Sequence, residues 1–400
     1  MKLLVADKFS EKHLGELRAL GMDVRYQPEL GAADLPAALP GVHVLVVRST
    51  EVTARAIEAA DALTLIVRAG AGVNTIDRAA ASRRGIFVAN CPGKNAIAVA
   101  ELTMGLLLAI DRRIPDQVTE LRAEKWNKKE YGKADGVHGK TLGVLGVGSI
   151  GAEVVGRARA LGMQVVAWSR SLNDTRAKEL GCERCANPLE VARRADVVSL
   201  HLALTPETRG LVGAEFLAAM KPGAILLNTA RAEVVDAEAL ASAVRERGLR
   251  VGLDVHVGEP DTGTGRLSSP LVALPGVYGT HHVGASTRQA EEAIAGEAVR
   301  IVRAFALKGE VPNCVNLRRR SPAKWQLVVR HFDRVGVLAN VLGTLRRHQI
   351  NVEEIVNQIF DGASAACCTI RLGAEPSSEC LAEIRGRSDE VLHAALIAIP

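Results

Sequence analysis

The chain has 400 residues, of which 48% are hydrophobic and 24% are charged, and this composition is that of an ordinary globular protein. The length exceeds what one hydrophobic core usually holds, so we expect two or three domains. The formal net charge of +5 is mildly basic. It favours small anionic ligands and lacks the strong basic signature of a nucleic-acid-binding protein, so we expect no nucleic-acid partner.

The apolar segments are short for a membrane or secreted protein. The N-terminal run MKLLVADKF reaches Asp7 after only a few apolar residues, so we expect no signal peptide and a cytoplasmic location. The most apolar helical stretch, 96–110, contains Glu101 and is shorter than the roughly 18 apolar residues of a membrane span. We expect it to be a buried helix and the protein to have no membrane contact.

The 7 cysteines are an odd number scattered through a long chain, which predicts free thiols in a reducing compartment. Cys182 and Cys185 form a CxxC pair. A structural zinc site needs four ligands, and no second CxxC or HxxxH completes this one. We therefore expect ordinary thiols and no metal site.

Short β-rich runs alternate with helical stretches from Lys2 to about Val88, which predicts a parallel sheet with crossover helices. The strand-like runs are KLLVA, VHVLVV, LTLIV and IFVA, and helical patterns cover 10–20 and 53–60. After a long helix that begins near Ala96, the alternation restarts through TLGVLGVG, VVAWS, DVVSLHL, AILLNTA and RVGLDV. This restart predicts a second α/β unit, and a closing helix from 287 to about 308 can pack back on the first.

The pattern changes after Arg320 to a βαββαβ order, which is the ferredoxin-like arrangement. Its expected strands are WQLVVRHFD, INVEEIVNQIF, SAACCTIRL and VLHAALIAI, with helices over 335–348 and 377–385. We therefore predict an α/β fold with two Rossmann-like parallel-sheet domains and a C-terminal ferredoxin-like domain. The expected boundaries are 1–96 with 285–317 for a discontinuous first domain, 97–284 for the second, 318–324 for a linker and 325–400 for the third.

Gly146, Gly148 and Gly151 form GVGSIG between the apolar strand TLGVL and a helix that opens with Ser149 and Ile150. In a dinucleotide site the first glycine allows a tight turn, the second lets the backbone approach the pyrophosphate, and the third lets the helix pack closely on the strand. The helix N-terminus offers unpaired N–H groups to the phosphate charge. This strand-turn-helix setting therefore predicts a dinucleotide-binding site.

The next strand ends at the point where an NAD site usually offers a carboxylate to the ribose 2′-hydroxyl. This sequence has Ser169 and Arg170 there instead. A guanidinium matches the geometry of a 2′-phosphate. We predict NAD as the cofactor, with NADP accepted as a second possibility. An exposed arginine beside a tolerant NAD pocket fits the same residues.

Three stretches that follow predicted strands resemble the signature motifs of the D-isomer-specific 2-hydroxyacid dehydrogenases. They are NTARAEVVD (228–236), LDVHVGEP (253–260) and GTHHVGAST (279–287). The resemblance covers roughly 1–317, through RSTEVT, RAGAGVNTID, PGKNAIAVAELTMGLLL, HLALTPETRGLVG and PNCVN. It implies that Arg231 anchors the substrate carboxylate, that Glu259 orients a histidine, and that His282 is this histidine and the acid/base. The implied substrate is a small anionic 2-hydroxy or 2-oxo acid.

The chemistry suits these residue types, because imidazole can accept and return a hydroxyl proton near neutral pH and arginine can hold a carboxylate through two hydrogen bonds. Two positions depart from the family pattern. His281 stands where the family often has proline, and we assign catalysis to His282 because it precedes Val283-Gly284. Ala232 stands where the family usually has glycine.

The resemblance also implies further contacts in a substrate domain, 1–96 with 285–317. Backbone N–H groups of the loop RAGAGV bind the substrate carboxylate in the family, and other side chains line the pocket. The matching residues are Ala71, Gly72, Val73, Arg48, Arg68 and Asn95. Two arginines suit a second anionic group on the substrate, whereas Lys128 and Lys129 fit a solvated loop better. Thr229 and Asp254 match positions near the nicotinamide, and a structural cap is the alternative for Asp254.

Residues 325–400 resemble an ACT domain, a small regulatory module that commonly binds amino acids at a dimer interface. His331 and Asn351 match effector-contacting positions, whereas Asp333 replaces an asparagine and Val335 a proline. L-serine or another amino acid is therefore one expected effector, and a structural dimerisation module is the alternative. We expect a homodimer or a homotetramer.

A dehydrogenase pattern followed by an ACT domain most resembles the D-3-phosphoglycerate dehydrogenase branch of the family, which oxidises C2 of 3-phosphoglycerate. Two alternatives stay open. A glyoxylate/hydroxypyruvate reductase fits Ser169 and Arg170. A corepressor-like protein that senses the nicotinamide redox state keeps the same fold, but the presence of Arg231, Glu259 and His282 favours catalysis.

Overall fold

The structure is a computed structural model, which describes residues 1–260, 264–318 and 321–399. The chain divides into two compact units, Met1–Asn316 and Leu317–Pro400. Arg319 and Arg320 of the expected linker lie outside the described residues.

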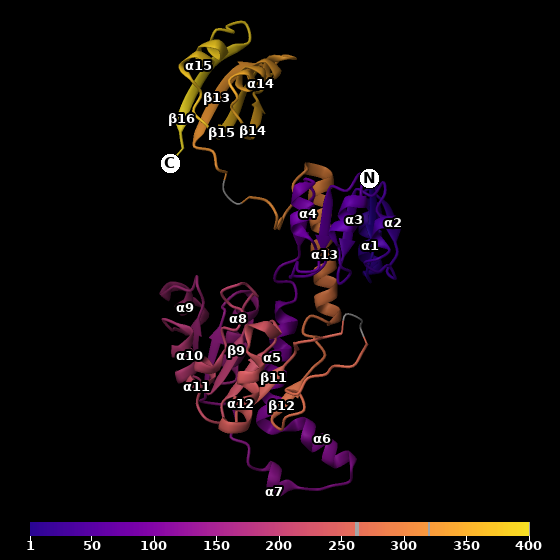
Figure 1. The fold of residues 1–400 in the computed structure, drawn as a ribbon, viewed down its shortest axis with the longest axis vertical. Coiled ribbons are helices and arrows are strands. Elements are labelled where there is room, and N and C mark those ends of the chain that lie inside the picture. The colour runs from indigo at the N-terminus through magenta and orange to yellow at the C-terminus, as the bar shows by residue number, and fades with distance from the viewer. Residues whose placement is uncertain (261–263, 319–320, 400) are drawn as a thin grey trace. The chain divides into compact units, whose positions relative to one another are not determined.

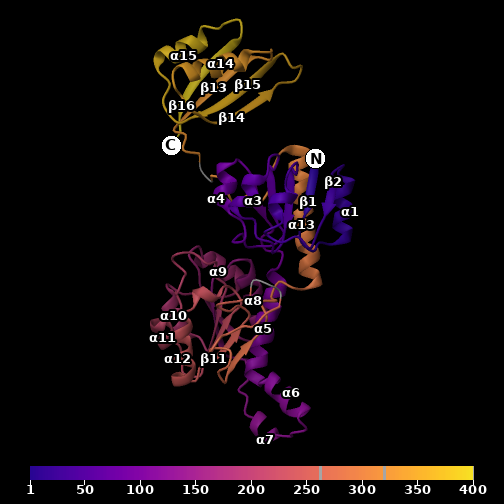
Figure 2. The same cartoon turned by 45° about the vertical axis from the view of Figure 1, so that its right-hand side comes forward.

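The first unit holds two parallel sheets, which Figures 1 and 2 show in two lobes. The five-stranded sheet has the spatial order β2-β1-β3-β4-β5. Its strands are β1 (Lys2–Val5), β2 (Asp23–Tyr26), β3 (Val44–Val47), β4 (Leu65–Arg68) and β5 (Phe87–Asn90). Its helices are α1 (Glu11–Ala19), α2 (Leu35–Ala38), α3 (Ala54–Ala59), α4 (Arg78–Arg83) and the returning helix α13 (Arg288–Lys308).

Side chains of this sheet alternate between two hydrophobic cores. On β1, Leu3 and Val5 face the core that α1 and α13 cover, whereas Leu4 faces the core that α2, α3 and α4 cover. A parallel sheet covered on both faces is apolar along whole strands rather than at every second residue. This is why the strands appear in the sequence as the continuous apolar runs KLLVA and VHVLVV.

The seven-stranded sheet has the order β12-β11-β10-β9-β6-β7-β8, and all of its strands are parallel. The strands are β6 (Thr141–Leu145), β7 (Gln164–Trp168), β8 (Glu183–Arg184), β9 (Val197–Leu200), β10 (Ile225–Asn228), β11 (Arg250–Leu253) and β12 (Val277–Gly279). One face is covered by α5 (Ala96–Arg112), α8 (Ser149–Ala160) and α9 (Asp174–Leu180). The other is covered by α10 (Pro188–Arg194), α11 (Ala214–Ala219) and α12 (Ala237–Arg247). The strand order reverses between β6 and β9, where open α/β sheets bind ligands.

Helices α6 (Ile114–Arg122) and α7 (Lys128–Tyr131) form an arm that projects from the seven-stranded sheet on the side away from the five-stranded sheet (Figures 1 and 2). Neither helix has a buried residue. The long helix that the sequence predicts from Ala96 ends at Arg112, because Arg113 takes a left-handed conformation with φ of 51°.

Two edge strands carry no signal in the sequence. Strand β2 has no buried residue, and both residues of β8 are exposed. The central strands are covered on both faces and therefore consist of apolar residues throughout. Strands β2 and β8 lie at sheet edges and are not buried, so neither contains such an apolar run.

The two CxxC thiols belong to the cores of the seven-stranded sheet. Cys185 lies in one core and Cys182 packs against the other, so the two side chains lie on opposite faces. Burial raises the pKa of Cys182, and it raises the pKa of Cys185 to about 11. Within the described ranges, no three His, Cys, Asp or Glu side chains are grouped so as to hold a metal ion.

The second unit has an antiparallel sheet of order β14-β15-β13-β16. Its elements are β13 (Trp325–Phe332), α14 (Val337–Arg347), β14 (Val352–Ile359), β15 (Ala365–Leu372), α15 (Ser378–Arg385) and β16 (Val391–Ala398). This is the ferredoxin-like βαββαβ arrangement. Together with the two parallel sheets, it confirms the predicted fold class.

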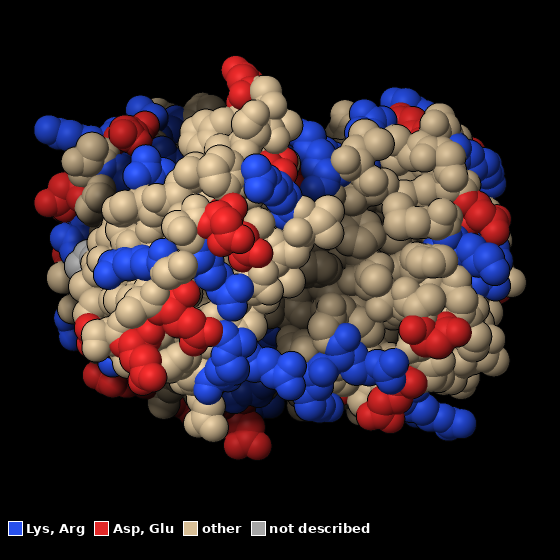
Figure 3. Space-filling view, turned by 90° about the horizontal axis from the view of Figure 1, so that it is seen from above, with Lys and Arg blue, Asp and Glu red and all other residues tan. Residues whose placement is uncertain are grey.

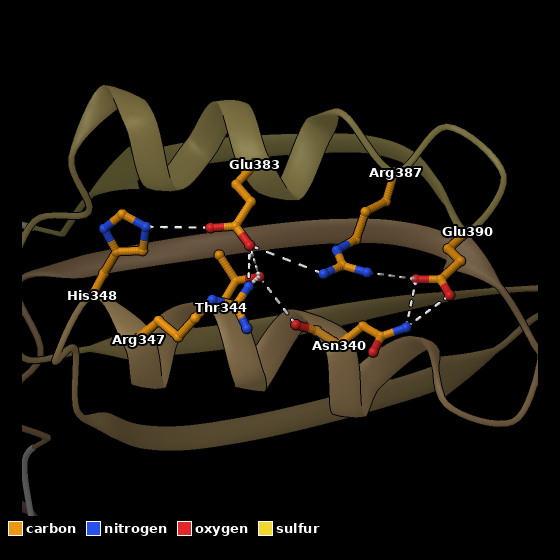
Figure 4. Close-up of polar contacts among 7 residues, drawn as sticks. All are labelled: Asn340, Thr344, Arg347, His348, Glu383, Arg387 and Glu390. Carbon is orange, nitrogen blue, oxygen red and sulfur yellow. Dashed lines mark hydrogen bonds and ion pairs between the residues drawn. The ribbon is translucent and has the colours of Figure 1, made fainter.

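A polar network joins the two helices of this second unit (Figure 4). Glu383 of α15 forms ion pairs with Arg347 and His348 at the end of α14. Farther along, Asn340 of α14 donates to Glu390 over 2.7 Å. These contacts hold α14 and α15 side by side above the hydrophobic core of the sheet.

The surface has no single dominant charge on the face drawn in Figure 3, which agrees with the modest net charge of the sequence. Basic and acidic side chains are mixed with uncharged ones over the face that Figure 3 draws. Among the described residues, no helix combines the length and the apolar character that crossing a bilayer requires.

Glu297 ties α13 to the segment that follows it. Its carboxylate accepts hydrogen bonds from Arg300 and, over 2.7 Å, from Asn313, and these contacts lower the pKa of Glu297 to about 2. Only 8% of Glu297 is exposed. Asn313 also donates to the carbonyl oxygen of Asn90, so the network fastens residues 311–316 to β5.

A substitution at this carboxylate tests its contribution. A pKa below the usual carboxyl value stabilises the fold above about pH 4.5, and the contribution is lost as the pH falls towards 2. We predict that Glu297→Gln lowers the free energy of unfolding by about 1–3 kcal/mol at pH 7. The difference from the parent should shrink as urea unfolding is repeated down to pH 3. A difference that stays constant over this range contradicts the assignment.

Candidate active site

The glycine turn between β6 and α8 has the geometry of a diphosphate site. Gly146 has φ of +93°, and a Cβ on it would lie 2.4 Å from the carbonyl oxygen of His201. A Cβ on Gly151 would lie 2.1 Å from the carbonyl oxygen of Gly146, whereas nothing lies within 4 Å of a Cβ on Gly148. Helix α8 has no side-chain cap. The open side of Gly148 and the unpaired N–H groups of Ser149 and its neighbours therefore fit a bound dinucleotide.

The end of β7 lies beside this turn. Leu145 of β6 pairs with Trp168 of β7, and the N–H of Gly146 donates to the carbonyl oxygen of Trp168 over 2.8 Å. Ser169 and Arg170 follow directly, the first half-buried and the second exposed. The structure therefore places both residues where the sequence expected the ribose contacts, with no carboxylate between 168 and 171.

The two side chains predicted to act as the acid/base pair, Glu259 and His282, lie within hydrogen-bond distance. The Nδ1 atom of His282 lies 2.6 Å from Oε2 of Glu259. The other carboxylate oxygen of Glu259 accepts the backbone N–H of His256 over 2.7 Å, and the His256 ring is itself bound to the carbonyl oxygen of Thr280 over 2.8 Å. Because Nδ1 is bound to Glu259, Nε2 on the far side of the His282 ring faces away from that carboxylate. No motif in the sequence pointed to this link through His256.

His282 has a left-handed backbone with φ of +52°, which costs a non-glycine residue about 1–2 kcal/mol. Asp254 holds this conformation through hydrogen bonds to the residues on either side of His282. Its carboxylate is only 1% exposed and accepts the N–H groups of Val283 and Gly284, each over 2.9 Å, and the hydroxyl of Thr280 over 2.7 Å. Asp254 thus clamps the loop that carries the histidine, and its contact with a nicotinamide stays a prediction.

The turn after β10 presents Arg231. The side chain of Asn228 accepts the N–H of Ala230 and donates to the carbonyl oxygen of Arg231. Thr229, which is buried, shares a hydrogen bond of 2.9 Å with Thr103 of α5. Ala232 begins the 3-10 turn Ala232–Val234, a conformation that alanine adopts without strain, so the departure from glycine leaves the local backbone intact.

Three arginines, Arg48, Arg68 and Arg231, lie close enough to one another for their charges to interact. Burial, reinforced by the positive charges of Arg231 and Arg48, lowers the pKa of Arg68. The Arg68 guanidinium lies directly over Gly70, where a Cβ would fall within 1.6 Å of it, and a Cβ on Gly72 would lie 3.0 Å from Arg231. Like charges gathered in a half-buried site attract an anion, which relieves their repulsion.

A cavity of about 840 Å³ is lined by residues from both lobes of the first unit. Of the predicted substrate and catalytic residues, it is lined by Arg48, Arg68, Ala71, Asn95, Glu259 and His282. His281 also lines the cavity, but Glu259 binds His282, which favours His282 as the acid/base. Arg231 lies near Gly72, where an added Cβ would come within 3.0 Å of its guanidinium group, and Val73 follows Gly72 in the loop after β4. Lys128 and Lys129 lie on α7 in the projecting arm, outside the cavity lining.

The predicted effector residues do not meet within one chain. His331 is buried on β13 and binds Asn357 of β14, and it pairs with one end of β15. Asn351 precedes the strand residue that pairs with the other end of β15, and its side chain donates to Glu353. Asp333 follows His331 and donates its backbone N–H to Ser364. The site that the sequence expected is therefore not assembled in a single copy.

The fold and the site define a two-lobed dinucleotide-binding fold in which both lobes line one cavity that contains arginine side chains. Comparisons with known proteins agree. Residues 104–284 match the NAD binding domain of the D-isomer specific 2-hydroxyacid dehydrogenases. A D-3-phosphoglycerate dehydrogenase of Methanocaldococcus jannaschii is 38% identical over 368 residues, which cover 91% of this chain and 66% of the relative. A hydroxypyruvate reductase of Thermotoga maritima is 41% identical over 268 residues, which cover 66% of this chain and 85% of the relative.

Solved structures share the same fold. The NAD+-bound 3-phosphoglycerate dehydrogenase of Entamoeba histolytica superposes with a TM-score of 0.66 and 27% identity, covering 79% of this chain and 99% of that one. The chain belongs to the D-isomer specific 2-hydroxyacid dehydrogenase family. The predictions of the family and of NAD as the cofactor are confirmed. The chain spans just under two thirds of the length of the Methanocaldococcus jannaschii relative.

The three glycines make a testable contrast. A Cβ fits beside Gly148 in the free protein but occupies the space of a bound diphosphate. We predict that Gly148→Ala keeps the unfolding free energy within about 1 kcal/mol of the parent but weakens NADH binding about tenfold or more, a loss of about 1.4 kcal/mol. Gly151→Ala should instead destabilise the fold, because its Cβ overlaps the Gly146 carbonyl.

NADH fluorescence titration and thermal unfolding separate the two effects. Gly156→Ala is the matched control, since it lies on the same helix and its Cβ also meets nothing within 4 Å. NADH affinity of Gly148→Ala equal to that of the control would rule out this turn as the diphosphate site.

Proposed function

We propose that this chain is a D-3-phosphoglycerate dehydrogenase, which oxidises the C2 hydroxyl of 3-phosphoglycerate to 3-phosphohydroxypyruvate with NAD. The observation that carries the proposal is the cavity in which the Glu259–His282 pair meets Arg48 and Arg68, with Arg231 beside it. A substrate with a carboxylate and a phosphate carries two anionic groups, and three guanidinium groups can bind both. The Methanocaldococcus jannaschii relative, which matches 91% of this chain, bears this name.

In this proposal, separate groups of residues bind the two anionic groups of the substrate. Arg231 and the backbone N–H groups of Ala71, Gly72 and Val73 hold the substrate carboxylate, which fixes the position of C2. Arg48 and Arg68 bind the phosphate, and Asn95 lines the wall between the lobes. These contacts place the C2 hydroxyl at Nε2 of His282.

His282 accepts the hydroxyl proton at Nε2 while C2 loses its hydride. The imidazolium that forms gains a charge-assisted hydrogen bond from Nδ1 to Glu259, which stabilises it. When NAD is bound, its nicotinamide ring supplies the hydride acceptor. The positive charge of Arg231 stabilises the carboxylate throughout, and the left-handed turn at His282 keeps the ring directed at the substrate.

A glyoxylate/hydroxypyruvate reductase is the second candidate. Ser169 and Arg170 favour it, because they stand beside the glycine turn without a carboxylate and suit the 2′-phosphate of NADP. The Thermotoga maritima relative is named a hydroxypyruvate reductase. A nicotinamide-sensing corepressor is the third candidate, but such a protein has no need of the hydrogen-bonded Glu259–His282 pair.

The C-terminal unit and the helical arm suggest assembly. We propose that the C-terminal unit is an ACT domain and that the chain forms a homodimer or a homotetramer. Leu121 and Trp126 of the arm are 56% and 81% exposed, which suits burial against a second copy. Because His331 and Asn351 lie apart in one chain, an effector such as L-serine would bind between two. Sedimentation measures the assembly state, and repeating it with L-serine shows whether this effector acts on the assembly.

We also propose a cytoplasmic location, since the structure has free thiols at all 7 cysteines, as a reducing compartment maintains them.

A substrate panel tests the function. We expect kcat/KM for 3-phosphoglycerate to exceed that for glycerate and lactate by about a hundredfold or more, because the unphosphorylated acids leave Arg48 and Arg68 without their anion. The assay is run with NAD and NADP. Equal kcat/KM for phosphorylated and unphosphorylated acids points to the reductase, and the absence of turnover with every acid revives the corepressor.

The two neighbouring histidines test the mechanism. We predict that His282→Ala lowers kcat by about two to four orders of magnitude. His281→Ala, which removes a ring from the same cavity without a bond to Glu259, should lower kcat less than about tenfold. Steady-state kinetics of the two variants decide the assignment, and the reverse order would transfer the acid/base role to His281.

A further inference from the structure

Arg48, which lines the cavity, already has an anionic partner. Its Nη1 donates to Oε1 of Glu291 over 2.8 Å, between residues 243 positions apart in the chain. Glu291 lies in the first turn of α13. The side chains are 31% and 48% exposed, so both groups remain accessible to a ligand. The pair crosses from the loop after β3 to the helix that returns to the same sheet.

The loop of Arg48 is held in place without Glu291. Asp7, just beyond β1, accepts the backbone N–H groups of Arg48, Ser49 and Thr50 over 2.7, 3.2 and 3.1 Å. It also accepts the hydroxyl of Ser49 over 2.9 Å. Asp7 therefore fixes the backbone, and Glu291 acts only on the guanidinium group. A change at Glu291 should redirect the charge of Arg48 without moving its loop.

The carboxylate of Glu291 adds a negative charge beside a group of arginines whose positive charges act on one another. Arg48 and Arg231 both lower the pKa of Arg68, so the guanidinium groups feel one another's charge. Glu291 offsets part of this charge when no substrate is present. A phosphate dianion placed at Arg48 meets the carboxylate of Glu291, and the two negative groups repel each other.

We propose that Glu291 is a specificity-determining residue, which stands in for the second anionic group of the substrate and has to release Arg48 when that group binds. The inference rests on the proposed function in one respect, that the second anionic group is a phosphate. Glu291 thereby weakens the binding of phosphorylated acids and leaves the binding of acids without a second anion unchanged. It acts through Arg48, so it is a positioning residue and takes no part in proton transfer at C2.

Glu291→Gln removes the carboxylate charge and keeps a side-chain oxygen that can accept from Arg48. The matched control is Glu292→Gln, one position along the same helix. The carboxylate of Glu292 lies 3.5 Å from Nδ1 of His13 on α1, whereas that of Glu291 is paired with Arg48. The two variants change the net charge equally, and they differ in the partner that loses the charge, His13 in one and Arg48 in the other.

The test compares KM and kcat for 3-phosphoglycerate and for D-glycerate. We expect Glu291→Gln to lower KM for 3-phosphoglycerate by about two- to tenfold, with kcat and the KM for D-glycerate unchanged. Glu292→Gln should change neither KM. In an Arg48→Ala background the effect of Glu291→Gln should vanish. An unchanged ratio of the two KM values, an equal effect of Glu292→Gln, or an effect that persists without Arg48 overturns the proposal.

A second measurement separates this inference from the proposed function. Inorganic phosphate is tested as a competitive inhibitor with whichever 2-hydroxy acid the protein turns over best. Glu291→Gln should lower the inhibition constant of phosphate by the same two- to tenfold. If 3-phosphoglycerate is not a substrate, the proposed function fails, while the phosphate result still decides the role of Glu291. An inhibition constant that does not change overturns that role.

Discussion

The hydrogen bond between His282 and Glu259 depends on the parallel pairing of β11 with β12. The two residues are 23 positions apart, but Leu253 and Gly279 are paired at the ends of the two strands, so the loops that follow them leave the sheet side by side. Asp254 then clamps one loop and His256 joins it to the other. The Glu259–His282 pair is therefore a product of the sheet edge, and its geometry is kept by the buried Asp254 and the half-buried His256.

The five-stranded sheet supplies the other half of the site by the same rule. Arg48 follows β3, Arg68 ends β4, and Asn95 lies beyond β5, and these three strands are neighbours in the sheet. The carboxyl ends of parallel strands lie at one edge, so cationic side chains gather there although they are distant in the sequence. In the proposed function, one edge binds the anion and the other moves the proton, so both lobes are needed to form the site.

The sequence predicted most of the fold because both parallel sheets are covered on two faces and their central strands are continuous apolar runs. It could not predict β2 or β8, whose residues at the sheet edges are not buried. Its motifs pointed to His282, Glu259 and Arg231, and the structure joins the first two by a hydrogen bond. The clamp by Asp254 agrees with the structural cap that the sequence left open as an alternative. The link through His256 and the partner of Arg48 could not be predicted, because each depends on which loops the fold brings together. For the same reason the sequence did not show that His331 and Asn351, which both match effector-contacting positions, lie apart in the C-terminal sheet.

The central claim is that the Nδ1–H group of His282 donates a hydrogen bond to Glu259, which leaves Nε2 free for the substrate. Nitrogen-15 NMR of histidine-labelled protein measures this directly, with the His282 signals assigned by their absence in His282→Gln. We predict that the neutral imidazole of His282 carries its proton on Nδ1, with an unprotonated Nε2. A neutral ring with its proton on Nε2 would contradict the account, because no group would then be poised to accept the C2 hydroxyl proton.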